Sequence, residues 1–191
     1  MPDVANAGSI EAWLRADPSR WRILGIIRQL ELPDCWIGAG FVRNAVWDAL
    51  HGRPASVDGD VDVLWFDRRR TEPGADAGIE ATLRRLDPAI DWSVRNQARM
   101  HVRNGDPPYR STEDAMRCWP ETATAVAVRR TMQDGFEVNA PLGLADLFGL
   151  VLRPAPGFQG SKHRQYLERV EAKGWLSSWP RLRMEEAVAA P

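Results

Sequence analysis

The pattern of apolar and polar positions predicts short strands alternating with helices. Residues 9–31 carry apolar side chains at near-helical spacing, and Pro18 interrupts them, which predicts two helices or one kinked helix. A short apolar strand is expected at residues 35–37. A glycine turn follows it and leads into a helix at about residues 41–50.

The next segment predicts two more strands with a helix between them. Residues 60–66 form a strongly apolar run, and residues 68–78 form a loop that leads into a helix ending at residue 86. A further strand is expected at residues 90–94. This order of elements predicts an α+β (mixed α/β) fold, with a small mixed sheet flanked by helices.

The second half of the chain predicts a hairpin and three helices. Ser111 and Asp114 have the spacing of a capping box, which predicts a helix near residues 115–119. Two β-rich stretches can pair across the turn at residues 133–135. These stretches are residues 123–129 and 136–140, and the remaining helices are expected at residues 142–150 and 161–172.

Composition indicates an ordinary soluble globular protein. The 191 residues are 44% hydrophobic and 27% charged, which predicts a single domain spanning residues 1–191. The chain has no apolar run long enough for a membrane span and no pattern of a secretion signal, so a cytoplasmic protein without a membrane partner is expected. The two cysteines lack metal-ligand spacing and are expected to be free thiols.

The net charge of the chain indicates which class of molecule it binds. The formal net charge is −1 and the pI is about 6.3, whereas a protein with an extended nucleic-acid surface is normally basic. A small acceptor therefore fits the sequence better than a long polynucleotide. The sequence leaves the oligomeric state open.

The strongest chemical signal is a pair of carboxylates that follows the glycine turn. Asp60 and Asp62 are separated by one residue on a predicted strand, so they point to the same face and repel each other unless a cation intervenes. A hard, oxygen-seeking ion such as Mg²⁺ (or Mn²⁺) suits them. The alternative is a solvated edge strand, although the neighbouring residues are apolar. Asp58 can join the same alternation or lie in the preceding loop.

The glycine turn supplies a candidate phosphate site. Gly38 and Gly40 are expected to let backbone N–H groups approach an anion at a helix start. Arg43 on that helix can grip phosphate oxygens with its fork of donors. A structural ion pair with Asp48 or Asp60 is the alternative for Arg43.

Three further residues are candidates for the same site. Asp91, near the start of the strand at residues 90–94, is a candidate third metal ligand, or it is only the polar entry to that strand. Asn96 and Arg99 follow this strand and can contact the triphosphate or ribose of a nucleotide. Alternatively, they form a hydrogen-bonded structural plug beneath the site.

These residues resemble the polymerase-β-type nucleotidyltransferase superfamily, whose pattern is a Gly-Gly turn, Val-Arg-Asp and then Asp-x-Asp on a strand. The present chain has Ala39 between its glycines and Asn44 where an acid is usual. It is more closely similar to a family of small bacterial nucleotidyltransferases, from about residue 36 to residue 179. The matching segments are residues 39–48, 60–67, 92–101 and 140–148.

The resemblance implies a metal-dependent enzyme that moves a nucleoside monophosphate from an NTP to an unidentified acceptor. The competing hypothesis is a catalytically inactive nucleotide-binding or regulatory module of the same fold, which the absence of a third carboxylate near Asp60 and Asp62 would favour. A metal-dependent phosphohydrolase ranks last, because the chain has three histidines and no histidine cluster.

Overall fold

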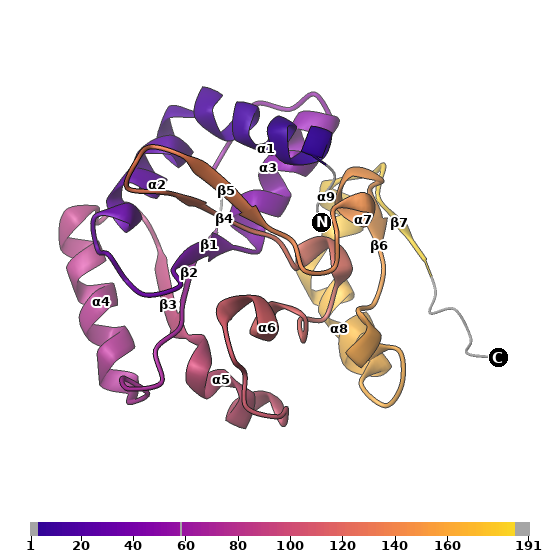
Figure 1. Cartoon of the computed structure of the whole chain (residues 1–191). Coiled ribbons are helices and arrows are strands. Elements are labelled where there is room, and N and C mark those ends of the chain that lie inside the picture. The colour runs from indigo at the N-terminus through magenta and orange to yellow at the C-terminus, as the bar shows by residue number, and fades with distance from the viewer. Residues whose placement is uncertain (1–3, 58, 186–191) are drawn as a thin grey trace.

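A computed structural model describes residues 4–57 and 59–185, which build a five-stranded sheet covered by helices (Figure 1). The first half contains α1 (Val4–Ala16), α2 (Pro18–Arg28), β1 (Trp36–Gly38), α3 (Gly40–Leu50), β2 (Val61–Trp65), α4 (Pro73–Leu86), β3 (Trp92–Asn96) and α5 (Gln97–Asn104). The second half contains α6 (Thr112–Met116), η1 (Thr122–Thr124), β4 (Ala127–Arg130), β5 (Phe136–Asn139), α7 (Ala145–Phe148), β6 (Val151–Leu152), η2 (Pro156–Phe158), α8 (His163–Lys173), α9 (Trp175–Ser178) and β7 (Arg183–Met184).

The main sheet is mixed, which confirms the predicted α+β class. Its strand order is β3-β2-β1-β4-β5, with β2 and β3 parallel and the other neighbours antiparallel. β4 and β5 form the predicted hairpin. A separate pair, β6 and β7, is parallel and joins residues near the end of the described chain to the segment that follows α7.

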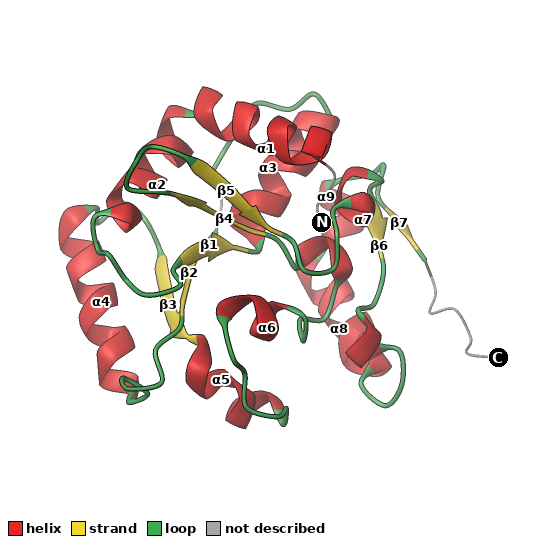
Figure 2. Cartoon of the chain, in the orientation of Figure 1, coloured by secondary structure: helices red, strands yellow, loops and turns green. Residues whose placement is uncertain are grey.

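The sheet has two different faces because strand side chains alternate. Ile37, Val63 and Val94 lie on the face that packs into the main core with side chains of α1 to α4. Trp36 and Leu64 lie on the other face, in a small cluster with α6. Figure 2 shows α5 and α6 on the side of the sheet opposite α1 and α2. Asp62 is out of phase with the core residues of β2, and it therefore emerges on the second face.

Local signals explain the helix boundaries near the N-terminus. Pro18 begins α2, and the Asp17 carboxylate caps it by accepting hydrogen bonds from the backbone N–H groups of Ser19 and Arg20. The predicted interruption is therefore a break between two helices. The buried Arg20 side chain donates to the carbonyl oxygen of Phe41, which ties α2 to the first turn of α3.

Residues near the end of the described chain pack against α3. The Trp47 ring of α3 makes edge contacts with Trp175 and Trp179, with ring centroids 5.9 and 5.1 Å apart. The indole N–H of Trp179 donates to Asp48 at 2.8 Å. Figure 1 shows α8 and α9, in orange and yellow, beside elements from the first half. Among the described helices, none combines the length and apolarity needed to cross a membrane.

Several boundaries differ from the sequence expectation. The strand expected at residues 90–94 is β3, Trp92–Asn96, and it runs directly into α5, a helix that the apolar pattern did not predict. α5 has few apolar side chains, and the Asn96 side chain caps it. The helix expected at residues 142–150 is only the single turn α7.

Candidate active site

The glycine turn brings the start of α3 against the strand that carries the acids. The register Ile37↔Val63 between β1 and β2 places Gly38 opposite Asp62. A Cβ at Gly38 would lie 2.7 Å from the Leu64 Cδ1 atom and 3.2 Å from the Trp119 ring, so a larger residue here would force these side chains to shift. The turn itself is made by Ala39, whose φ of 52° lies in the region that favours glycine. Gly40 starts α3 and has neither a positive φ nor a steric constraint.

Asp60 and Asp62 differ in their exposure to solvent. Asp62 is half-buried and lines a cavity, whereas Asp60, just before β2, is exposed. Burial raises the pKa of Asp62, and the negative charge of Asp60 raises it further. A hydrogen bond from Ser93 and the positive charges of Arg95 and Arg169 act in the opposite direction.

This pair has the donor chemistry of a site for a hard divalent cation. Two carboxylates supply oxygen ligands, and a cation beside them would offset both the burial of Asp62 and the negative charge of Asp60, which raise the pKa of Asp62 in that order. Within residues 4–57 and 59–185, however, no group of three or more His, Cys, Asp or Glu side chains is arranged to hold a metal. The fit therefore rests on two carboxylates.

Asp91 lies beside the pair without completing it. The parallel register Val61↔Trp92 sets Asp91 next to Asp60, and the Asp91 carbonyl accepts the Val61 N–H at 2.8 Å. Its side chain is exposed at the strand entry. The predicted three-carboxylate set is thus not assembled, because Asp91 and Asp60 both precede their strands and face solvent. Asp58 lies outside the described residues.

A cavity of about 550 Å³ opens above Asp62 on the second face of the sheet. Its floor contains Asp62, Leu64 and Arg95, and Ala39 of the turn lies at its edge. Its walls come from α5, from the loop after α6 and from the segment that includes α8. The wall residues include Gln97, Met100, Arg103, Cys118, Trp119, Phe158, Lys162, Gln165 and Arg169.

Arg43 lies buried beneath this cavity. Its guanidinium lies over the rings of Trp47 and Trp175, at 4.9 and 4.4 Å from their centroids. It donates to the Thr124 hydroxyl at 3.0 Å and to Asn44 at 2.9 Å. Burial lowers the pKa of Arg43 to about 10, although the charge of Glu121 opposes this shift. The described contacts of Arg43 include no ion pair with Asp48 or Asp60, the predicted alternative, and Asp48 accepts a hydrogen bond from Trp179.

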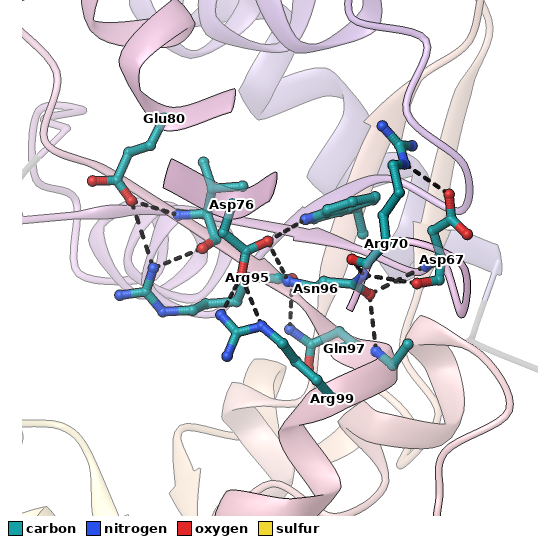
Figure 3. Close-up of polar contacts among 11 residues, drawn as sticks. Asp67, Arg70, Asp76, Glu80, Arg95, Asn96, Gln97 and Arg99 are labelled. Carbon is teal, nitrogen blue, oxygen red and sulfur yellow. Dashed lines mark hydrogen bonds and ion pairs between the residues drawn. The ribbon is translucent and has the colours of Figure 1, made fainter. Parts of the chain in front are cut away.

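Asn96 and Arg99 make the contacts of a structural plug (Figure 3). Asn96 is fully buried, and its amide donates to the backbone carbonyls of Asp67 and Arg70. Arg99 donates to Asp76, the buried acid of α4. Both side chains contact α4 or the loop before it, and neither lines the cavity described above, so these contacts favour the structural alternative over contact with a nucleotide.

Sequence reasoning missed the cations of α8. Lys162, Gln165 and Arg169 are spaced at three and four residues, which places them on one face of a helix. That spacing was a usable signal, but nothing local indicated that this face meets Asp62. Glu121, which pairs with Arg169 at 2.8 Å, had no sequence signal.

Comparisons with known proteins agree with this geometry. A family model described as Nucleotidyltransferase matches residues 25–184. A structure determined by NMR and described as a CCA-adding enzyme head domain is 34% identical, with a TM-score of 0.82; the match covers 93% of this chain and 94% of that one. Among the curated proteins compared, none matches this chain.

More distant structures share the fold. A CCA-adding enzyme in complex with CTP is 14% identical with a TM-score of 0.55, and the Thermotoga maritima CCA-adding enzyme in complex with tRNA is 16% identical with a TM-score of 0.60. The match covers 91% and 93% of this chain but only 49% and 42% of theirs. This chain therefore corresponds to less than half the length of those enzymes.

Proposed function

This chain belongs to the nucleotidyltransferase family, and from that membership we propose that it transfers a nucleoside monophosphate from an NTP to a small acceptor with the help of a divalent metal ion. The observation that carries the proposal is the position of Asp62 at the floor of a cation-lined cavity, opposite Gly38 of the glycine turn and two residues from the exposed Asp60. Negative ligands for a metal and positive ligands for phosphate thus meet at one place.

The chemistry follows from these groups. The oxygen of an acceptor hydroxyl forms a bond to the α-phosphorus of the NTP, and the bond from that phosphorus to the oxygen bridging to the β-phosphate breaks. Pyrophosphate leaves with that oxygen, and the hydroxyl proton passes to solvent beside the exposed Asp60. Asp60 and Asp62 would hold the metal ion, which when bound polarises the phosphate and helps to ionise the hydroxyl.

The arginine and lysine side chains of the cavity would bind the triphosphate. Arg95 and Arg169 line the cavity close enough to Asp62 for their charges to act on its pKa. Arg103 and Lys162 lie on its walls. Fixed positive charges of this kind stabilise the negative charge on the phosphates without reorganisation during the reaction.

The size of the cavity and the net charge of the whole chain support a small acceptor. The cavity volume of about 550 Å³ lies within the about 300–1,000 Å³ typical of small-molecule sites. The net charge of −1 supplies no broad positive field for a polynucleotide. That CCA-adding enzymes act with tRNA is a property of much longer chains.

A nucleotide-binding module without catalysis is the second candidate. The observation that favours it is that Asp60 and Asp62 have no third ligating side chain among the described residues. Such a module would bind an NTP in the same cavity but would release no pyrophosphate.

The decisive experiment combines binding with turnover. Each NTP with Mg²⁺ is titrated into wild type, Asp60→Asn and Asp62→Asn, and pyrophosphate release is then measured across a library of small hydroxyl acceptors. We expect metal-dependent binding that both variants lose, and turnover with at least one acceptor. Glu168→Gln, which changes an exposed acid of α8, is the matched control and is expected to behave as wild type.

The outcomes separate the two candidates. Metal-dependent NTP binding without pyrophosphate release from any acceptor would favour the binding module. A folded wild type that binds no NTP would contradict both.

A further inference from the structure

Glu121 is a fully buried carboxylate with an incomplete set of partners. One of its oxygens accepts the Nε–H of Arg169 at 2.8 Å. The other, Oε2, has no hydrogen-bond partner in the part of the chain that the structure describes. A buried carboxylate is costly unless it is compensated, so its placement requires an explanation.

Arg43 is the second cation of this buried group. The charge of Glu121 raises the pKa of Arg43, whereas the charge of Arg169 lowers it, so the three groups interact electrostatically. The Arg43 Nε atom is also buried without a hydrogen-bond partner among the described residues. The single negative charge of Glu121 therefore lies near two arginines. These three side chains together carry one excess positive charge, and they lie beside the Asp60–Asp62 pair.

Arg169 presents that excess charge to the cavity. Its side chain is 37% exposed, whereas that of Glu121 is 0% exposed. Among its described contacts, the hydrogen bond from Nε to Glu121 fixes the guanidinium, which also lies 5.6 Å from the Trp175 ring centroid. An arginine held through Nε can offer its terminal nitrogens to two oxygens of a phosphate.

We propose that Glu121 is a positioning residue that orients Arg169 as the phosphate-binding arginine of the cavity. The ligand class is a polyphosphate, and the inference rests on the proposed function for identifying it as the triphosphate of an NTP. Arg99, in its structural pair with the buried Asp76, is also partly exposed, but it does not line the cavity. Arg169 does line the cavity, at a position where its charge reaches Asp62, while its partner Glu121 is hidden.

The test uses inorganic tripolyphosphate without metal, which probes the cations independently of any base or transfer step. It is titrated into wild type, Glu121→Gln, Arg169→Gln and the double variant. Each single change is expected to weaken binding by about tenfold, the effect of one charge-assisted hydrogen bond. The double variant is expected to bind no more weakly than Arg169→Gln, because Glu121 acts through Arg169.

Controls separate positioning from folding. Arg164→Gln removes an exposed cation from the same helix and is expected to bind as wild type. Thermal unfolding without ligand identifies variants that have lost structure. If Glu121→Gln does not fold, Arg169→Lys decides, since lysine keeps the charge but not the fork, and wild-type affinity in that variant would overturn the proposal.

The remaining outcomes distinguish this proposal from the proposed function. Wild-type affinity in folded Glu121→Gln, or additive losses in the double variant, would overturn the positioning role. Asp62→Asn is expected to keep tripolyphosphate binding while losing metal-dependent NTP binding. Tripolyphosphate binding that depends on Glu121, in a protein that transfers from no NTP, would support the positioning role and overturn transfer.

Discussion

Ala39 occupies a backbone conformation that glycine adopts more easily. Its φ of 52° and ψ of −124° give the N-cap of α3 an orientation that an L-residue adopts at a cost of about 1–3 kcal/mol. Ala39→Gly removes that strain and adds about 0.5–1 kcal/mol of chain entropy to the unfolded state. We expect a net gain of about 1 kcal/mol in the free energy of unfolding, measured by chemical denaturation.

The same substitution elsewhere in α3 supplies the control. Ala45 lies inside the helix, so Ala45→Gly is expected to lower the free energy of unfolding by about 1 kcal/mol. If both changes destabilise the protein to the same degree, Ala39 is not strained and the prediction is wrong.

Asp62 gives the site a defined pH dependence. Burial, and then the charge of Asp60, raises its pKa above the ordinary aspartate value of 3.8. Between that value and the raised pKa, the folded state holds a proton that the unfolded state has lost, so stability falls as pH rises through this window. Asp62→Asn is therefore expected to unfold at a higher temperature than wild type at neutral pH. The difference should close as pH falls below the ordinary value.

Asp67 is the control for this experiment, because its pKa is shifted in the opposite direction to that of Asp62. A hydrogen bond from Arg70 lowers the pKa of Asp67, so its ionised form is the one that the folded state favours. Asp67→Asn is expected to lose stability at neutral pH, and acid should erase that loss. Equal pH profiles for the two variants would contradict the raised pKa that we assign to Asp62.

The sequence identified those site residues whose position follows from spacing along a single strand. The alternation along the strand identified Asp62, which lines the cavity, and β2 spans Val61–Trp65 within the expected residues 60–66. The roles of Glu121 and Arg169 depend on contacts between segments 48 residues apart, which no local pattern encodes. For Asn96 the sequence left nucleotide contact and a structural role open for the same reason, because its partners lie in the loop before α4.

At the scale of elements, α5 depends on one buried acid. Asp76 of α4 accepts hydrogen bonds from the Trp65 indole, from the Asn96 backbone N–H and from Arg99, so it joins α4 to β2, β3 and α5 (Figure 3). Other residues of α5, including Met100, line the cavity. The orientation of this wall therefore depends on Asp76.

Asp76→Ala is expected to lower the free energy of unfolding by about 3–5 kcal/mol, because it leaves the charge of Arg99 partly buried and unpaired. Glu80→Ala, on the same helix, breaks more exposed pairs with Arg84 and Arg95 and is expected to cost about 1 kcal/mol or less. Urea denaturation of both variants measures the difference. Equal losses would show that Asp76 is not the connection we describe.

The sequence predicted the helices that have a clear apolar periodicity. It did not predict the helix that depends mainly on contacts with distant segments. The expected helices at residues 41–50 and 161–172 correspond to α3 and α8. α5 begins without a loop after β3 and is mostly polar, so it has no apolar stripe from which to predict it. Its stability comes from the Asn96 cap and from Arg99, which are tertiary as well as local features.

At the scale of the whole molecule, the single domain predicted from length remains a prediction, and the continuity of the core shows how to test it. One cluster of buried apolar side chains extends from Ile10 to Leu182, and Trp47 joins α3 to α9. The cavity takes its floor from the first half of the chain and Arg169 from the second. Separate unfolding of the two halves would therefore expose core residues of both.

We expect one cooperative unfolding transition. Nine tryptophans spread along the chain report tertiary packing by fluorescence, and far-ultraviolet circular dichroism reports the helices. Because the core is continuous, both signals should give the same midpoint, and Trp179→Phe should shift both together by removing the indole donor to Asp48. A fluorescence transition that precedes the loss of helix, or a Trp179→Phe effect confined to one signal, would divide the chain into two cooperative units and contradict a single domain.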